Sequence, residues 1–447
     1  MSTLAAQPHD PPPPEAKVQR DAPSPEPLAL ILQTTTLLFA NGETTERTVT
    51  GGSRVAQVLG YRATLVPGWD ELTVRLESST GSQHDIAQVA PAGIDMNKVL
   101  ATERTIDAIS DGRVQAKDAE STFAKVAALP PVSLGRFVLA AAVGASALSV
   151  IFGAEHPASV ALIALSAGAG AVLRRELSRV SSNLFLQPFA AALLAGLVGG
   201  VAQRYQLSSP LALVALCPCM VLVPGPHFLN GLIDLAHARV TLGCSRIAFA
   251  TMVVVAISAG LLIGLWLVGA TLPLSPPSRS VALAVDVAAA GLAISAYGSF
   301  YSMPWRYLPI PILVGMVAHG TRWLALSKGA SAHAAAFLAC LFVGLVLTPF
   351  SHRVRLPFAA MAFAAVVSLI PGVFLFRMAA GLVQMAELGA NAPSSLVSVV
   401  LAEGSTALLI LLAMGFGLSA PLLAERSGPI RGTATMSPAG AERVRKA

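Results

Sequence analysis

Two proline-glycine pairs, Pro224-Gly225 and Pro371-Gly372, interrupt otherwise apolar stretches of the chain. Proline removes a backbone donor and clashes with the preceding turn, and glycine adds conformational freedom, so each pair is expected to break a helix. Inside a membrane, a broken helix persists only where it is buried in protein or lines a cavity that holds water. We therefore expect these four residues to form part of a binding site for a small polar molecule.

A polar face follows the first break, because His227, Asn230 and Asp234 are spaced i, i+3 and i+7 and so lie on one side of a helix. The free N–H groups at the start of that helix can bind a carboxylate, and Asp234 can bind an ammonium group. An amino acid carries both charges, so we predict that these three residues bind substrate together with the proline-glycine pairs. The alternative is that Asp234 and His237 lie at the cytoplasmic mouth, where Asp234 only pairs with Arg239.

Two carboxylates, Asp286 and Glu403, each stand alone in an apolar stretch. A charged carboxylate at the centre of a bilayer costs roughly 2.5–3.5 kcal/mol, so such a residue usually faces the interior of a helix bundle. We predict that Glu403 or Asp286 carries a coupled proton, and Glu403 is the stronger candidate because the small and hydroxyl residues 404–406 let water approach. The alternative role is an internal hydrogen bond to a neighbouring helix. His319 and His333 flank a predicted outer loop and are expected at the surface.

The composition indicates the class of protein. The chain has 447 residues, of which 54% are hydrophobic and 12% charged, and its mean hydropathy is +0.67. These values differ greatly from those of soluble proteins and indicate a polytopic helical membrane protein that is surrounded by lipid. The net charge of +6 does not indicate nucleic-acid binding, because the basic residues are spread over loops and tails. The four cysteines form neither a metal-binding pattern nor a disulfide framework, so no metal or other cofactor is expected.

Apolar stretches of about 20 residues, long enough to cross a bilayer, recur along most of the chain. The seventh of them is short and contains two prolines. We predict ten spans, whose cores are residues 137–153, 157–173, 184–202, 210–235, 247–270, 280–300, 306–320, 333–350, 356–378 and 396–420.

These spans divide into two groups of five, within residues 132–272 and 273–422. The two proline-glycine pairs are 147 residues apart, and the same offset brings the first span to the sixth and the fifth to the tenth. An odd number of spans per repeat makes the halves run in opposite directions, as in many secondary transporters. The predicted fold is an all-α polytopic membrane protein with two inverted five-helix repeats, preceded by a small soluble α/β domain.

The two ends of the chain differ from its apolar centre. Residues 1–27 are proline-rich, lack the pattern of a secretory signal peptide and are predicted to form a disordered head, and residues 423–447 form a basic tail. Residues 28–131 are predicted to form the soluble domain. Within it the pattern predicts strands at 61–67 and 71–77, joined by a turn at 67–70, and helices at 28–40, 97–112 and 117–129.

The distribution of basic residues predicts the orientation in the membrane, since lysine and arginine favour cytoplasmic loops. With the N-terminus inside, the predicted inner loops carry eight arginines and the outer loops five basic residues, and the tail adds further basic residues inside. Both termini and the soluble domain are therefore predicted to be cytoplasmic, in the inner membrane, with Glu155 and Arg204 in outer loops.

Several short motifs have a characteristic order and spacing, namely Asn41-Gly42-Glu43-Thr44, Pro224-Gly225, Asn230-Gly231, Asp234-Leu235, Gly243, Arg246, Ile370-Pro371-Gly372 and Arg377. Together they resemble the threonine/serine exporter family over residues 28 to 420. The resemblance implies export of threonine, serine or similar small metabolites, driven by the proton gradient, and it extends to exporters of small dicarboxylates. From the residues alone the interpretation is a secondary transporter for a small zwitterion or anion, compatible with a homo-oligomer.

Two other classes of function remain open from the residues. For an intramembrane enzyme, the spans contain neither a His-Glu-x-x-His zinc motif nor a Gly-x-Ser-x-Gly motif, although a serine nucleophile outside such motifs is not excluded. A membrane sensor or scaffold would use the N-terminal domain alone. The phosphate-binding Gly-x-x-x-x-Gly-Lys motif is absent, which argues against ATP hydrolysis. The sequence therefore favours a transporter that is not an enzyme.

Overall fold

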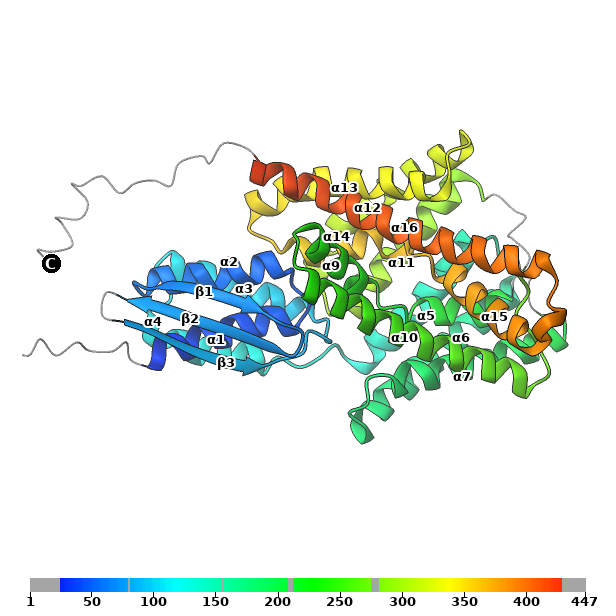
Figure 1. Cartoon of the computed structure of the whole chain (residues 1–447), viewed down its shortest axis with the longest axis horizontal. Helices are drawn as coiled ribbons and strands as arrows, with labels where there is room; N and C mark the ends of the chain where they lie inside the picture. The colour runs from blue at the N-terminus through cyan, green and yellow to red at the C-terminus, as the bar shows by residue number, and fades with distance from the viewer. Residues whose placement is uncertain (1–24, 79–80, 155, 208–211, 275–280, 428–447) are drawn as a thin grey trace, which may run out of the picture.

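The computed structural model describes residues 25–78, 81–154, 156–207, 212–274 and 281–427. An α/β part made by the N-terminal residues lies at one end of a long helical bundle (Figure 1). We call that end of the bundle the domain side and the opposite end the far side. Residues 1–24 of the predicted head, 428–447 of the predicted tail, and Glu155, which was expected in an outer loop, lie outside the described residues.

The α/β part contains a three-stranded antiparallel sheet of order β1-β2-β3. Strand β2 buries Leu72, Val74 and Leu76 on one face, as its alternating pattern requires. The predicted strands and helices are confirmed, and the structure adds α2 and β3. The elements are α1 (Pro25–Ala40), α2 (Thr45–Val58), β1 (Arg62–Pro67), β2 (Glu71–Ser78), β3 (Gly81–Gln88), α3 (Met96–Ser110) and α4 (Ala116–Ala127).

The bundle is entirely helical, and its described part contains nine helices long and apolar enough to cross a membrane, or ten if the bent pair α8 and α9 forms one span. That pair is bent by 54° at the first proline-glycine break. The first half contains α5 (Leu134–Ile151), α6 (Pro157–Val180), α7 (Leu186–Arg204), α8 (Leu213–Met220), α9 (Gly225–Ala236) and α10 (Val240–Leu267).

The second half contains the second break, between a short 3-10 helix η2 and α15. Its helix α16 continues five residues past the predicted end of the membrane part at 422. The elements are α11 (Leu283–Phe300), η1 (Trp305–Tyr307), α12 (Pro309–Ser327), α13 (Ala332–Val354), α14 (Phe358–Val366), η2 (Val367–Leu369), α15 (Gly372–Leu388), η3 (Gly389–Asn391) and α16 (Ser394–Ser427).

The same pairs of helices pack together in both halves. Helix α7 packs on α10 as α13 packs on α16, α5 packs on α6 as α11 packs on α12, and α5 and α11 pack against each other. Glycines allow the closest of these approaches. A Cβ atom on Gly264 of α10 would meet the backbone of α7, and one on Gly417 of α16 would meet the backbone of α13. Small residues thus bring helix backbones together where lipid provides no hydrophobic driving force.

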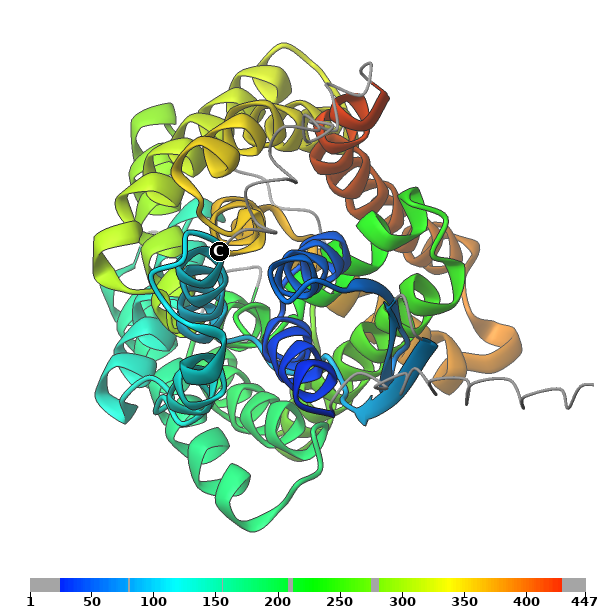
Figure 2. The same cartoon turned by 90° about the vertical axis from the view of Figure 1, so that its left-hand side faces the viewer.

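Contacts to the α/β part show which helix ends lie on the domain side. The end of α11 lies there, because the backbone N–H of Met96 donates to the carbonyl of Tyr301. The start of α5 lies beside it, because Arg136 donates to the carbonyl of Met303 and stacks on Trp305. The end of α13 also lies there, because Arg47 of α2 donates to the hydroxyl of Ser351. In the view from the domain side, the α/β part lies in front of the bundle, and helices of the bundle extend past its outline (Figure 2).

Candidate functional site

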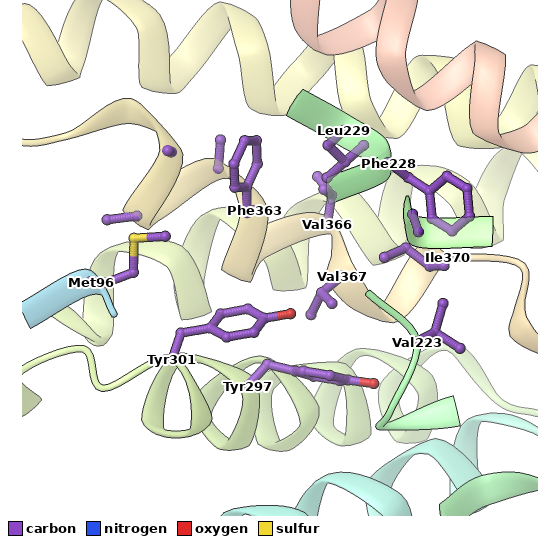
Figure 3. Packing of buried hydrophobic residues seen from close by; sticks show 14 of the residues in the cluster. Met96, Val223, Phe228, Leu229, Tyr297, Tyr301, Phe363, Val366, Val367 and Ile370 are labelled. Carbon is purple, nitrogen blue, oxygen red and sulfur yellow. The ribbon is translucent and has the colours of Figure 1, made fainter. Parts of the chain in front are cut away.

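The two proline-glycine breaks pack directly against each other. A Cβ atom on Gly225 would collide with the side chain of Ile370, which precedes the second break. A Cβ on Gly372 would lie 3.2 Å from Cγ of Met220 and 3.5 Å from Cγ2 of Val223, which precede the first break. Each glycine therefore accepts side chains that flank the opposite break. Figure 3 shows Val223 and Ile370 near each other, with Val367 and Tyr297 close by.

A small cavity lies between the breaks. It is lined by Met220 and Val223 from the first break, by Ser368 and Ile370 from the second, and by Tyr297 from α11. The space available to the centre of a water molecule is about 10 Å³, enough for about one water. This conformation is therefore closed at the breaks and leaves no room there for an amino acid.

Asp286 is not alone, because it forms a buried hydrogen-bonded chain with two residues distant in sequence. Its Oδ2 lies 3.1 Å from Nδ1 of His319, and Nε2 of the same imidazole lies 2.9 Å from Oγ of Ser368. All three residues are less than 9% exposed, and His319 is completely buried. Arg322 lies three residues after His319 on the same helix, α12 (Pro309–Ser327).

The prediction that His319 lies at the surface is wrong. The histidine is ten residues from the start of α12, which corresponds to about 15 Å along the helix axis. Because α12 follows η1 on the domain side, His319 lies about halfway through the bundle. Sequence reasoning also missed Ser368, since no local motif marks a serine in an apolar segment.

An aspartate on Nδ1 and a serine on Nε2 is the order found in hydrolytic triads. Ser368, however, faces a cavity with room for about one water, and it is buried on all other sides. An acyl substrate therefore has no space beside the hydroxyl in this conformation.

Glu403 is also paired. Its Oε1 lies 2.8 Å from Nη2 of Arg377, and Arg377 donates to the carbonyl of Leu274, which follows α10 on the far side. The neighbouring hydroxyl of Ser405 bonds instead to the carbonyl of Ala402. The second oxygen of Glu403 has no hydrogen-bond partner among the described residues.

The face formed by His227, Asn230 and Asp234 points toward the α/β part rather than into the cavity between the breaks. Asn230 donates to the carbonyl of Gly42, 3.2 Å away. The ring of His227 lies against Phe249 and beside the backbone of residues 91–92, and within the described chain neither ring nitrogen completes a hydrogen bond. The helix-face prediction is consistent with this geometry, whereas the substrate role of the three residues stays a prediction.

Asp234 is the centre of an ion-pair cluster that joins the α/β part to the bundle. Its Oδ2 lies 3.1 Å from Nε of Arg246 and accepts a hydrogen bond of 3.0 Å from Thr45. Its Oδ1 lies 3.3 Å from Arg239, which also pairs with Glu46 at 2.8 Å. The Asp234–Arg239 pair that the alternative interpretation predicts is thus observed, and Arg246 and Thr45 add to it.

A much larger cavity lies between the α/β part and the domain-side ends of α9, α13, α14 and α16. We call it the vestibule, and it has a volume of about 470 Å³. Carboxylates and guanidinium groups lie side by side on its wall: Arg54 pairs with Asp107 at 2.6 Å, and Arg47 lies 3.9 Å from Glu103. Within the described residues, no group of three or more His, Cys, Asp or Glu side chains could hold a metal ion.

Comparison with known proteins decides the family. Residues 29–268 match the family model ThrE, which is described as "Putative threonine/serine exporter", and residues 286–424 match the model ThrE_2, which is described as "Threonine/Serine exporter, ThrE". The chain belongs to the threonine/serine exporter family. No solved structure matches it.

The two exporter models divide the chain near the predicted boundary between the halves. The first model includes the α/β part, the first break and the Asp234 cluster. The second model begins at Asp286 and includes His319, the second break and Glu403. Family membership therefore supports a multi-pass membrane protein for amino-acid export and a transporter rather than an enzyme.

The vestibule of this exporter-family protein contains a carboxyl group that titrates near neutral pH. The pKa of Glu103 is raised to about 7, mainly by burial and also by the nearby Glu43, while Arg47 acts in the opposite direction. Burial also raises the pKa of Glu43, whose Oε1 accepts hydrogen bonds from Thr44. The ionised form of Glu103 is thus disfavoured in the folded protein.

We expect the α/β part to become less stable as the pH rises. A folded-state pKa of about 7, above the ordinary value of 4.5, means that the stabilisation is complete below pH 4.5 and is lost as the pH rises through 7. The difference corresponds to about 3 kcal/mol at most. Glu103→Gln should remove most of this dependence in unfolding measurements on the full-length protein at pH 5 and 8. The control is Glu120→Gln, an exposed glutamate on α4, and an unchanged pH dependence in Glu103→Gln would contradict the expectation.

Proposed function

We propose that this protein is a secondary transporter of the inner membrane that exports small amino acids, threonine and serine foremost, from the cytoplasm and is driven by the proton gradient. The observation that carries the proposal is the mutual packing of the two breaks around a closed cavity. Broken helices that face each other in the two halves of a transporter form its substrate site. In this proposal Pro224, Gly225, Pro371 and Gly372 shape that site.

The vestibule is proposed as the place where substrate first binds from the cytoplasm. A zwitterionic amino acid presents one carboxylate and one ammonium group, and the vestibule wall alternates guanidinium groups and carboxylates. His227, Asn230 and Asp234 lie between the vestibule end and the first break, on α9. Their contacts with the α/β part must open before substrate can pass from the vestibule to the breaks.

We further propose that the two halves are inverted repeats and that both termini are cytoplasmic. Helices α5 and α11 occupy corresponding places in the two halves, and the start of α5 lies beside the end of α11. Helix α9 ends on the domain side at Ala236, shortly before Arg239, which pairs with Glu46, whereas α15 begins near the closed breaks and carries Arg377 to the far side. These opposite directions, and the reciprocal packing of Gly225 and Gly372, support the inverted arrangement.

Asp286 and Glu403 are proposed as the proton-coupling carboxylates. Each has a cationic or titratable partner inside the second half, His319 for Asp286 and Arg377 for Glu403. When such a carboxylate takes up a proton, its attraction to the partner weakens, and the packing of the helices that carry the two groups can change. Glu403 lies on α16 and its partner on α15, directly after the second break.

Uptake into inverted vesicles tests the function. Labelled threonine should accumulate when the vesicle interior is made acidic, and unlabelled serine should compete. Competition by succinate with none by serine would instead favour the alternative of a dicarboxylate exporter. Vesicles that accumulate none of these solutes would contradict the proposal.

The same assay tests proton coupling at Glu403. Glu403→Gln should exchange threonine at a rate within about twofold of the parent rate. Its accumulation driven by the pH gradient should fall at least tenfold, because the amide side chain cannot take up the proton. Glu387→Gln, an exposed glutamate at the end of α15, is the matched control. Full accumulation in Glu403→Gln would remove Glu403 from the coupling mechanism.

A further inference from the structure

We propose that His319 relays the coupled proton between Asp286 and the cavity at the two breaks, with Ser368 as the last group of the relay. The inference rests on the proposed proton-driven export and adds two residues to it. Three different elements, α11, α12 and η2, each contribute one group to a continuous hydrogen-bonded line. Among the described residues that line the cavity between the breaks, Tyr297 is the one with a titratable side chain.

The chemistry of the three groups suits proton transfer. Imidazole can accept a proton on one ring nitrogen and release one from the other, and a serine hydroxyl is both donor and acceptor. When Asp286 is protonated, its O–H bond breaks as a bond to Nδ1 of His319 forms. The Nε2–H bond then breaks as its proton bonds to the oxygen of Ser368, and the serine at the same time releases its own O–H proton to a water in the cavity. This leaves ionised Asp286, a neutral ring with its proton on Nδ1, and a protonated water. Rotation of the ring by half a turn exchanges the two nitrogens and prepares it for the next proton.

The charged surroundings favour a relay over storage of charge on the ring. Arg322 lies three residues after His319 on the same helix, α12, and its positive charge disfavours a second positive charge on the ring. Among the described residues, Asp286 of α11 is the titratable group at Nδ1 of the ring, and Ser368 of η2 lies at Nε2. The ring is therefore better suited to pass a proton on than to hold it.

The line ends where it can affect the gate. Ser368 lies in a single 3-10 turn, three residues before Pro371, and lines the same cavity as Val223 and Ile370. When the ring carries its proton on Nδ1, its Nε2 accepts a hydrogen bond from the Ser368 hydroxyl, so that this O–H is directed toward His319. A ring with a proton on Nε2 makes the serine an acceptor and frees its own O–H for the cavity. Proton transfer thus changes the polar lining of the break at which substrate is proposed to bind.

The experiment uses the full-length protein in inverted vesicles with labelled threonine. In His319→Gln, accumulation driven by the pH gradient should fall at least tenfold while threonine exchange stays within about twofold of the parent. His333→Gln is the matched control, because His333 lies at the exposed start of α13 and its Nε2 bonds to the hydroxyl of Ser331 at the same helix end. Asp286→Asn should resemble His319→Gln, and the double variant should be no worse than either single one, since the two groups act in one path.

Several outcomes would overturn the relay. One is that His319→Gln accumulates threonine at the parent rate, and another is that the losses of accumulation in the two single variants add up in the double variant. A third is covalent labelling of Ser368 by a fluorophosphonate, which would show that the serine is a nucleophile. If His319→Gln loses exchange as well, the ¹⁵N NMR signals of the His319 ring in the parent protein provide the test. The relay requires that these signals change with pH and that Asp286→Asn alters the change. Signals that do neither contradict the relay. Failure of the parent to transport any amino acid would instead overturn the proposed function.

Discussion

Arg246→Ala should lower the free energy of unfolding by about 3–5 kcal/mol, the cost of removing one partner from a buried ion pair. Nε of Arg246 lies 3.1 Å from Asp234, and both side chains are 1% exposed. The guanidinium also stacks on Phe39 at 5.1 Å and lies 3.5 Å from the hydroxyl of Thr45. Its loss would leave the buried Asp234 carboxylate with only the partly exposed Arg239 as a cationic partner.

Because Phe39 and Thr45 belong to the α/β part, the same variant should loosen that part from the bundle. Thermal unfolding in detergent measures the stability, and limited proteolysis between α4 and α5 measures the loosening. Arg179→Ala, which removes an exposed pair with Glu176, is the control and should change little. Adding Asp234→Asn to Arg246→Ala should recover part of the loss. A loss no greater than that of the control would mean that the cluster does not hold the two parts together.

Gly225→Val should force the two breaks apart. A side chain at position 225 would collide with Ile370, and overpacking of a filled interior costs about 1–3 kcal/mol. If the closed state is destabilised by that amount and an open state is not, the open population should rise by about 5- to 150-fold. The reason is local, since the substitution occupies the space in which the second break now packs.

Maleimide labelling of a cysteine at Val223, which lines the cavity, would measure the opening. The exposed native Cys244 is first replaced by serine, whereas Cys217, Cys219 and Cys340 are buried. Labelling should be faster in Gly225→Val by the factor given above, and Ile370→Ala in the same chain should reverse most of the increase because it vacates the contested space. Gly135→Val is the control, because no atom lies within 4 Å of a Cβ built there. Equal labelling rates in Gly225→Val and Gly135→Val would show that the breaks do not gate the cavity.

The paired break was predictable because its cause is local. Proline and glycine disrupt a helix wherever they occur in it, and a bilayer admits such a break only in protein or beside water. The spans were predictable for a similar reason, since the thickness of the hydrocarbon core sets the length of an apolar helix. In the α/β part, β3 escaped prediction because its sequence, GSQHDIAQ, is polar and its side chains are mostly exposed. It forms a strand because its backbone pairs with the edge of β2 in antiparallel register.

The partners of the polar residues were not predictable. Sequence alone showed that Asp286 and Glu403 had to face other protein, because a lone charge in lipid is costly. Which groups they face depended on how the helices pack: His319 lies 33 residues from Asp286, and Ser368 a further 49. Likewise the periodicity put Asn230 and Asp234 on one face, but only the docking of the α/β part turned that face toward residues 42–45. Local chemistry determined the breaks, the spans and the buried charges, and long-range packing decided what each of them touches.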